Sequence, residues 1–451
     1  MTERPKVRWT AVAATSFQRD FWFLDRVTRR RGVYNVAATM RWPVPPDIGV
    51  VTDIATAIAE RQPALRTRLA VADDVLYALV GDQPGVQLDV SAVRAPLSAW
   101  DAIVADLACE PIDPGGAGTV RLRLLSAPPD PGRPVRCEPR LCAISHHALL
   151  DGRSLVAFLT EVCTTASGHG GTEAPRYAPG ASAAAQLIHF RRRHGDDVMY
   201  WRRRLRQPPP LRDRDRAAPG AHEAESVDLR LDPAHRQAVA DVAAAKRTSA
   251  FLVIVAAFLE VLRHGGSGDD LVVGISVDGR PASVDLGEYG CFTTVLPVRV
   301  GPVGPAGPDS VATTLDRLRD MFLDALDHAT ITLRDLQSIV GRAGLAAPYR
   351  YMATMLVSAD DIRAVSSGTK VDLALTMLDR DGATDCHFVY RPDVLSRAEV
   401  TDITADFVRV LAALTGRNGG VVPAPASLYP AEEKRIRHSR GLESEPKEPD
   451  E

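Results

Sequence analysis

The stretch RLCAISHHALLDGRSLVAFLTEV, residues 140–162, contains two different patterns of apolar residues. Residues 140–145 form a short, mostly apolar run, which predicts a buried strand. Further on, the apolar residues recur at the spacing of a helix: Leu155, Val156, Phe158, Leu159 and Val162. The polar residues between the two runs therefore lie on a loop held at both ends by a regular element, a common position for active-site groups.

This loop contains the adjacent histidines His146 and His147, followed by Asp151 and Gly152. In one interpretation the histidines are core residues bonded to the backbone, and Asp151 caps the helix that follows. In a second, His147 and Asp151 bind a metal ion. We expect no metal, because Gly152 and the preceding strand argue against a helix that would bring those side chains to one face, and no third ligand is near.

The third interpretation of the loop is acid–base chemistry. A neutral imidazole can take a proton from an attacking amine or hydroxyl, while the other histidine packs inward and stiffens the loop. Gly152 permits a sharp bend and a close backbone approach. No GxSxG sequence occurs, and no Ser or Cys is placed for activation by His147, so direct transfer between two bound substrates is favoured over a covalent enzyme intermediate.

The length of the chain, 451 residues, predicts two domains or one two-lobed body. Its formal net charge of −3 indicates no nucleic-acid partner and no anionic membrane partner. The polar start MTERPKVRW and the lack of a long apolar run predict neither a signal peptide nor a membrane span. Six scattered cysteines form no CxxC pair, which favours reduced thiols and a cytoplasmic location.

Further elements follow from the same kinds of pattern. We expect a helix over 17–27, strands over 120–126, 271–277 and 295–300, and a helix that starts at Thr248 or Ser249 and runs to 262. Gly, Ala, Ser and Pro are frequent in 164–186, which predicts an exposed connection, with a basic helix over 189–206 and a linker over 207–220 after it. The polar end, 431–451, is expected to be a disordered tail.

HHALLDG, residues 146–152, resembles the HHxxxDG signature of the condensation domains of nonribosomal peptide synthetases, which is shared across chloramphenicol-acetyltransferase-like acyltransferases. Other segments resemble the same family in the same order: SFQRDFWFLDRV (16–27), PALRTRL (63–69), VMYWRRRL (198–205), residues 249–280, YGCFTTVLPVRV (289–300), KVDLALTM (370–377) and VYRPDVLSRAEV (389–400). Because the matches cover nearly the whole chain, the resemblance is specific.

The resemblance implies an α/β (α+β) fold of two chloramphenicol-acetyltransferase-like lobes, arranged as a V-shaped pseudo-dimer with a central tunnel. The N-terminal lobe would cover 1–175 and carry the HHxxxDG motif. A linker and the basic helix would cover 176–222, and the C-terminal lobe would cover 223–430.

The resemblance also implies roles for the residues of the loop. His147 would be the catalytic base or positioning group, supported by His146, Asp151 and Gly152. Asp151 would form a bidentate bond with Arg280 of the family's Gly-Arg element. We also expect the backbone N–H of Gly152, near a helix N-terminus, to aid the tetrahedral oxyanion.

The implied donor is an acyl or aminoacyl thioester on the phosphopantetheine arm of an acyl or peptidyl carrier protein, and the implied acceptor is a small-molecule amine or alcohol. No permanently bound cofactor is expected. The 451 residues contain no adenylation or carrier domain, so we expect a free-standing enzyme of specialised-metabolite (antibiotic) biosynthesis whose carrier docks in trans.

One departure from the family pattern concerns the acceptor. Thr294 stands where the family usually has Asn, so a side chain that both donates and accepts is replaced by a shorter hydroxyl. With the neighbouring Tyr289 and Gly290, it marks the expected substrate-binding segment. Two other functions stay open: a coenzyme A- or polyketide-dependent O-acyltransferase of the same superfamily, and a non-catalytic recruitment domain.

Overall fold

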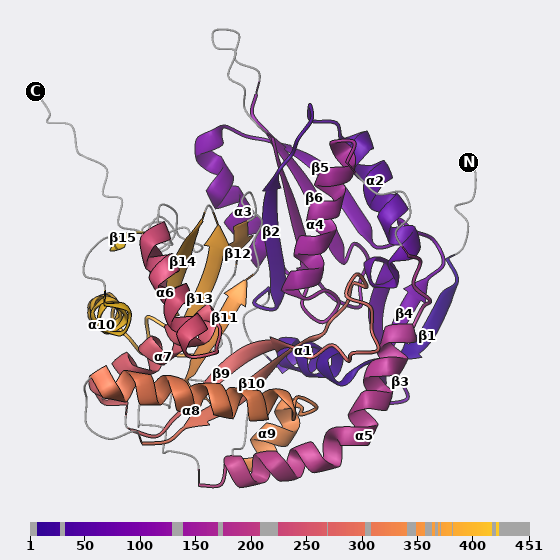
Figure 1. The fold of residues 1–451 in the computed structure, drawn as a ribbon. Coiled ribbons are helices and arrows are strands. Elements are labelled where there is room, and N and C mark those ends of the chain that lie inside the picture. The colour runs from indigo at the N-terminus through magenta and orange to yellow at the C-terminus, as the bar shows by residue number, and fades with distance from the viewer. Residues whose placement is uncertain are drawn as a thin grey trace, which may run out of the picture.

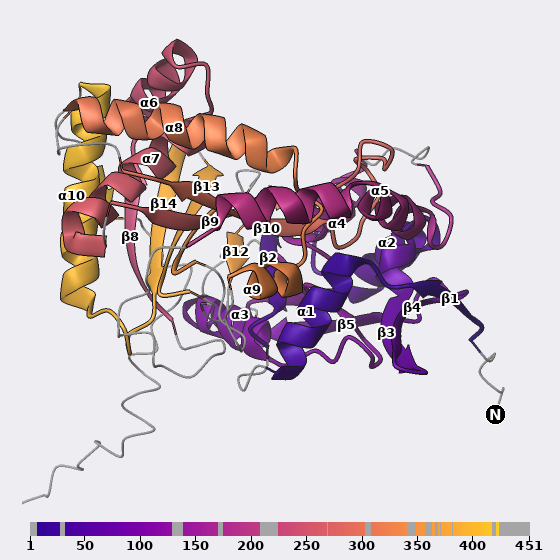
Figure 2. The same ribbon diagram turned by 90° about the horizontal axis from the view of Figure 1, so that it is seen from below.

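The structure is a computed structural model that describes residues 7–27, 32–128, 139–169, 175–207, 224–267, 269–302, 308–340, 349–356, 363–365, 369, 371–380, 382–416 and 421–423. Within these residues the chain forms a mixed α/β fold, as the sequence predicts, and its strands form three sheets. Figures 1 and 2 show the elements of the first and second halves of the chain as two neighbouring bodies.

Two sheets belong mainly to the first half of the chain. The smaller has the order β1 (Trp9–Ala13), β4 (Val75–Gly81) and β3 (Thr67–Ala72). The larger has the order β12 (Arg363–Val365), β2 (Asn35–Arg41), β7 (Arg140–His146), β6 (Val120–Ser126) and β5 (Leu88–Arg94). Strand β12 comes from the second half and pairs antiparallel with β2, so the two halves share this sheet.

Strand β7 reads as a continuous apolar run because both of its faces are covered. Alternate side chains point to opposite faces of a strand. Leu141 and Ala143 belong to one buried cluster, whereas Cys142 and Ile144 belong to another. Helices α2 (Ile48–Arg61) and α4 (Gly152–Ala166) complete the first cluster, and α3 (Trp100–Cys109) completes the second. Helix α1 (Ser16–Val27) packs on a further cluster, with Ala148 and Leu149 of the loop after β7.

Helix α4 follows the loop after β7, as predicted. Its buried side chains include Leu155, Phe158, Leu159 and Val162, which lie on one stripe of the helix. The predicted helix over 17–27 and the strand over 120–126 are likewise confirmed as α1 and β6. Two short 3-10 helices, Pro63–Arg66 and Leu97–Ala99, complete this half within the described residues.

Helix α5 (Ala181–Arg204) connects the halves and corrects one prediction. Residues 181–186, expected in an exposed connection, form its first turns, because an alanine-rich segment is a good helix former. Gly180 precedes the helix with φ of 79°, and a Cβ there would lie 2.6 Å from Val12, so the helix start packs directly on β1. The basic stretch predicted from 189 onward is helical to Arg204.

The second half is built on a seven-stranded sheet within the described residues. Its order is β10 (Thr293–Val300), β9 (Leu271–Asp278), β11 (Tyr351–Leu356), β13 (Leu373–Arg380), β14 (Ala383–Tyr390), β8 (Glu225–Leu231) and β15 (Val421–Pro423). Both strands predicted here, over 271–277 and 295–300, are confirmed as β9 and β10.

Helix α7 (Ala250–Leu262) is the central helix of this half. Every residue from Leu252 to Leu262 is buried, and Ser249 caps its N-terminus, as one of the two expected caps. A π-helix, Arg263–Ser267, follows it directly. The other helices of this half are α6 (Pro233–Ala245), α8 (Pro308–Leu326), α9 (Leu333–Ile339) and α10 (Arg397–Thr415).

Some predictions concern features that the structure does not describe. The tail over 431–451 and most of the linker over 207–220 lie outside the described residues. The boundaries at 175 and 223, the V shape and the tunnel stay predictions. Across the described ranges no single helix has the length and apolarity to span a membrane. Only when Pro233–Ala245 and Ala250–Gly265 are taken together do they have that length and apolarity, and the two helices are bent by 98° relative to each other.

Candidate active site

The loop after β7 is a tight turn fixed by backbone hydrogen bonds. The carbonyl oxygen of His146 accepts from the amides of Leu149 and Leu150, at 2.9 and 3.2 Å. The amide of His147 donates to the carbonyl oxygen of Tyr34, 2.7 Å away, which precedes β2. The two histidines therefore leave the strand at a point held by the neighbouring strand.

His146 points into the protein. Its side chain is buried, and its Nδ1 accepts a hydrogen bond from the amide of Ala148 at 3.1 Å. An accepting Nδ1 places the proton of the neutral ring on Nε2. Nε2 lies 3.5 Å from Oδ1 of Asp25 in α1. This arrangement agrees with the expectation that one histidine packs inward and stiffens the loop.

His147 has a different environment. It is only partly buried, and its ring stacks on Phe21 of α1 with centroids 4.1 Å apart and an interplanar angle of 17°. Stacking uses the face of the imidazole, whereas the ring nitrogens lie in the plane and point past Phe21. Helix α1 therefore backs both histidines, through Asp25 for the first and Phe21 for the second.

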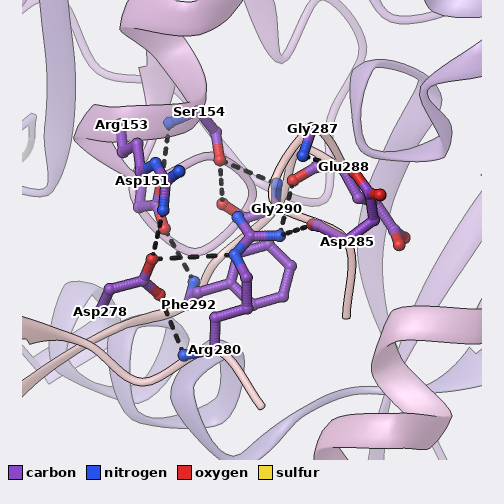
Figure 3. Close-up of polar contacts among 10 residues, drawn as sticks. All are labelled: Asp151, Arg153, Ser154, Asp278, Arg280, Asp285, Gly287, Glu288, Gly290 and Phe292. Carbon is purple, nitrogen blue, oxygen red and sulfur yellow. Dashed lines mark hydrogen bonds and ion pairs between the residues drawn. The ribbon is translucent and has the colours of Figure 1, made fainter. Parts of the chain in front are cut away.

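Asp151 is both a helix cap and a clamp (Figure 3). Its Oδ1 accepts from the amide of Ser154 at 2.8 Å, which caps α4, and its Oδ2 accepts from the amide of Phe292 at 3.0 Å. Burial raises the pKa of Asp151, and the hydrogen bonds from Ser154 and Phe292 oppose that rise. The capping role is therefore confirmed, and the same side chain also binds the second half of the chain.

Gly290 is bound to the start of α4 as well. Its carbonyl oxygen accepts from the amide of Asp151 at 2.9 Å, and its backbone exchanges hydrogen bonds with Oγ of Ser154, both at 3.1 Å. Arg153 adds an ion pair, with Nη1 at 2.7 Å from Oδ2 of Asp278 at the end of β9. The segment 288–292 therefore lies directly against the HHxxxDG loop (Figure 3).

The expected direct bond between Asp151 and Arg280 is wrong. Both oxygens of Asp151 accept backbone amides, and the Arg280 guanidinium instead donates Nη1 to the carbonyl oxygens of Asp285 and Glu288, at 2.6 and 2.9 Å. Its guanidinium carbon lies 3.6 Å from the centre of the Phe292 ring. Arg280 thus supports the same clamp indirectly, by shaping the segment whose amide Asp151 binds.

Tyr289, expected in substrate binding, lies in this segment. Its hydroxyl donates to Oε2 of Glu161 at 2.6 Å, and its ring packs in the core cluster of the first half. Its amide donates to Oε1 of Gln62 at 3.0 Å, and Nε2 of Gln62 donates to the carbonyl oxygen of Gly287. Burial raises the pKa of Tyr289.

Gly152 and Thr294 complete the predicted set. Gly152 is the first residue of α4, and a Cβ added to it would meet nothing within 4 Å, so the expected close backbone approach is wrong and open space lies beside it. Thr294 is buried near the start of β10. By the alternation of a strand it lies on the face that carries Leu296 and Val298.

The functional residues that sequence reasoning missed are those that hold the loop from outside it. Phe21 and Asp25 occur in the helix segment that carried part of the resemblance, but nothing in their spacing reveals which histidine each one meets. The contact of Asp151 with Ser154 could have been predicted, because the side chain of an N-cap residue commonly accepts from the amide three residues later. No group of three or more His, Cys, Asp or Glu side chains that could hold a metal ion occurs in the described part of the chain.

The arrangement can be compared with known proteins. The family model of the condensation domain matches residues 9–420. The chain belongs to the condensation-domain family. The resemblance drawn from HHxxxDG and the other segments is thereby confirmed, and the loop described above is the HHxxxDG loop of this condensation domain.

Relatives of this condensation domain occur in large synthetases. The phosphinothricin tripeptide synthetase PhsC of Streptomyces viridochromogenes is 26% identical over 401 residues, which is 83% of this chain and 36% of PhsC. The probable non-canonical nonribosomal peptide synthetase CymA of Salinispora arenicola is 24% identical over 91% of this chain, which spans only 6% of CymA. The chain therefore spans about a third or less of the curated relatives it matches first.

A solved structure supports the fold. The first condensation domain of the CDA synthetase superposes with a TM-score of 0.74 at 18% identity, covering 93% of this chain and 98% of that one. At this level of identity the likeness establishes the fold. The expected α/β architecture is thus that of solved condensation domains.

Proposed function

We propose that the protein transfers an acyl or aminoacyl group from a carrier-protein thioester to an amine or alcohol, forming an amide or ester in specialised-metabolite biosynthesis. The observation that carries the proposal is the position of His147. The residue is partly exposed, its imidazole lies flat on Phe21, and its backbone amide is held by the carbonyl oxygen of Tyr34. His146, by contrast, is buried and bonded within the turn.

In the proposed reaction, His147 acts on the acceptor. The nitrogen or oxygen of the acceptor attacks the thioester carbonyl carbon, and the imidazole takes the proton that the nucleophile loses or orients its lone pair. The C–S bond then breaks, the acyl group stays on the acceptor, and the phosphopantetheine sulfur leaves as a thiol after receiving a proton. No covalent bond to the protein is formed at any step.

The start of α4 has features that suit stabilisation of the oxyanion. The first amides of a helix have no intrahelical acceptor, and the N-terminus attracts negative charge. Gly152 stands at this position with open space around its Cα. We assign its backbone N–H as a donor to the tetrahedral intermediate, and Asp151 keeps the helix start in place.

The donor is proposed to arrive on a carrier protein. The arginines of α5 are candidate contacts for an acidic carrier helix. Arg202 and Arg203 are exposed, whereas Arg204 pairs with Asp324 and Arg193 donates to the carbonyl of Asp327. A coenzyme A donor is the second candidate, since a mutant of the starter condensation domain of rhizomide synthetase was solved in complex with C8-CoA and Leu-SNAC.

A non-catalytic recruitment role is a further candidate. The X-domain from teicoplanin biosynthesis, which shares this fold at a TM-score of 0.69 and 20% identity, was solved in complex with OxyB. The complete HHALLDG sequence favours catalysis over this role.

The deciding experiment measures acyl transfer with the protein as it stands. Loaded carrier protein, the matching acyl-CoA and a panel of amines and alcohols are incubated with the wild type, His147→Ala and His169→Ala, and products are identified by mass spectrometry. His169 is exposed and lies beyond the C-terminal end of α4, whereas the loop precedes the N-terminal end of that helix, so its variant is the matched control. We expect product with the wild type and control and at least about a 100-fold loss in His147→Ala. No product from any donor, or equal rates in His147→Ala, would favour recruitment.

A further inference from the structure

Helix α1, which backs both histidines, is bound to the second half of the chain by Asp20. Oδ2 of Asp20 accepts a hydrogen bond from the amide of Leu333 at 2.8 Å. Leu333 is the first residue of α9, where the amides have no acceptor within the helix. The residue after Asp20 is Phe21, on whose ring His147 stacks.

Helix α9 is itself held firmly, so it is a fixed reference for α1. Its N-terminus has a capping box in which Thr332 and Asp335 bond each other's backbone amides. The ring of His194 in α5 lies 3.1 Å from the carbonyl oxygen of Thr330 and 3.7 Å from Asp335. The amide to which Asp20 binds is therefore part of a network that includes α5.

The carboxyl of Asp20 lies among densely packed atoms, although the residue as a whole is partly exposed. Charged and titratable groups face it from three elements: Arg19 from α1, Asp335 from α9, and the thiol of Cys291 from the segment bound to Asp151. Burial raises the pKa of Asp20 to about 7, with Asp335 adding to the rise and Arg19 and the Leu333 amide opposing it.

We propose that Asp20 is a positioning residue for His147, an inference that rests on the proposed function. Its bond to Leu333 fixes α1 relative to the second half of the chain, and Phe21 at the next position transmits that placement to the imidazole by stacking. Asp20 itself touches no reacting atom. The two halves are thus joined on two sides of the loop, by Asp20 at α1 and by Asp151 at α4.

Ionisation of Asp20 should make the transfer rate depend on pH in a way that tests this role. The Leu333 amide favours the ionised carboxylate, but burial and the nearby Asp335 disfavour it by more, so ionisation favours exposure of Asp20 to water and its separation from Leu333. We therefore expect the transfer rate of the wild type to fall as the pH rises above 7. Deprotonation of the general base would raise the rate at lower pH and is a separate effect. The amide of an asparagine can accept from Leu333 but cannot ionise.

The test compares Asp20→Ala, Asp20→Asn and the wild type in acyl transfer from loaded carrier between pH 5.5 and 9. Asp53→Ala, on the exposed side of α2, is the control. In Asp20→Ala we expect kcat to fall by about 10- to 100-fold with a smaller change in KM, because a displacement of the reacting group costs rate rather than binding. Asp20→Asn should keep the wild-type kcat at pH 6 and lack the fall above pH 7.

The inference is overturned by a wild-type kcat in Asp20→Ala, or by the same decline above pH 7 in Asp20→Asn. A wild type without turnover defeats the proposed function instead, and an NMR titration of the His147 ring then tests the inference by itself. We expect the midpoint to move in Asp20→Ala and to return in Asp20→Asn. If the titration midpoint of His147 is the wild-type value in both variants, a positioning role is contradicted. If Asp20→Ala does not fold, the comparison of Asp20→Asn with the wild type still tests the inference.

Discussion

Oδ2 of Asp151 accepts a hydrogen bond from the backbone amide of Phe292, 3.0 Å away in space and 141 residues further along the chain. The other oxygen of the same carboxyl caps α4 at Ser154. One side chain thus fixes the helix that follows His147 and the segment that reaches it from the second half. Changes at Asp151 therefore affect the loop and the joint between the halves together.

Asp151→Ala should lower the free energy of unfolding by about 2–4 kcal/mol, because the helix loses its cap and two buried amides lose their acceptor. Asp151→Asn should cost less, since one amide oxygen remains to accept. Urea unfolding followed by circular dichroism measures both values. An alanine variant as stable as the wild type would contradict the clamp.

Arg280→Lys tests the indirect support of the clamp. A lysine keeps the charge, but it has neither the planar group that lies over Phe292 nor the fork that reaches the carbonyls of Asp285 and Glu288. We expect the amides of 285–292 to exchange hydrogen faster, by at least about tenfold, which corresponds to the loss of about 1.4 kcal/mol of local stability. Arg317→Lys, on α8, is the control, and equal protection in both variants would argue against this role of Arg280.

Thr294→Asn introduces the side chain that the resemblance to condensation domains leads us to expect at this position. Because an amide reaches further than a hydroxyl and both donates and accepts, we expect the relative rates with amine and alcohol acceptors to change by about threefold or more. Thr293→Asn places the same amide on the opposite face of β10 and is the control. Unaltered acceptor preference in Thr294→Asn would remove this residue from the acceptor site.

Asp20 should make the stability of the protein depend on pH. Its pKa is about 7 in the folded chain and 3.8 as the ordinary value, so the native state binds more protons between these limits. The contribution of the neutral acid is complete below about pH 4 and is lost as the pH rises through 7. Between pH 5 and pH 8 we expect the wild type to lose about 1–2 kcal/mol more than Asp20→Asn, a figure reduced for the partial exposure of Asp20. Parallel urea titrations of the two proteins would reveal it, and identical pH slopes would speak against a buried Asp20 acid.

The sequence was informative where the determinants are local. The spacing of Leu155, Phe158, Leu159 and Val162 predicts α4, and the apolar run before His146 predicts β7, since both follow from burial of a periodic face. The start of α5 was missed because alanine and glycine together suggest a loop, whereas Gly180 alone ends the connection and the alanines continue as helix.

The parts of the site that depend on long-range contacts could not be predicted. Asp151 was expected to bind Arg280, but both of its carboxylate oxygens accept hydrogen bonds from backbone amides. Every residue except proline has such an amide, so the sequence does not indicate which amides a carboxylate will bind. Likewise nothing local to Asp20 indicates Leu333, 313 residues away. Pairings of this kind are set by how the halves meet.

Strand β12 shows what this joint means for the first half as a separate fragment. Arg363–Val365 pairs with the outer edge of β2, opposite Ala37–Thr39. A polypeptide truncated before residue 363 would leave the donors and acceptors of that edge exposed, and an uncovered edge strand is a template for pairing with other molecules. Expressed without its C-terminal partner, the part that carries the histidine motif should self-associate, whereas co-expression of the two pieces should yield a reconstituted heterodimer.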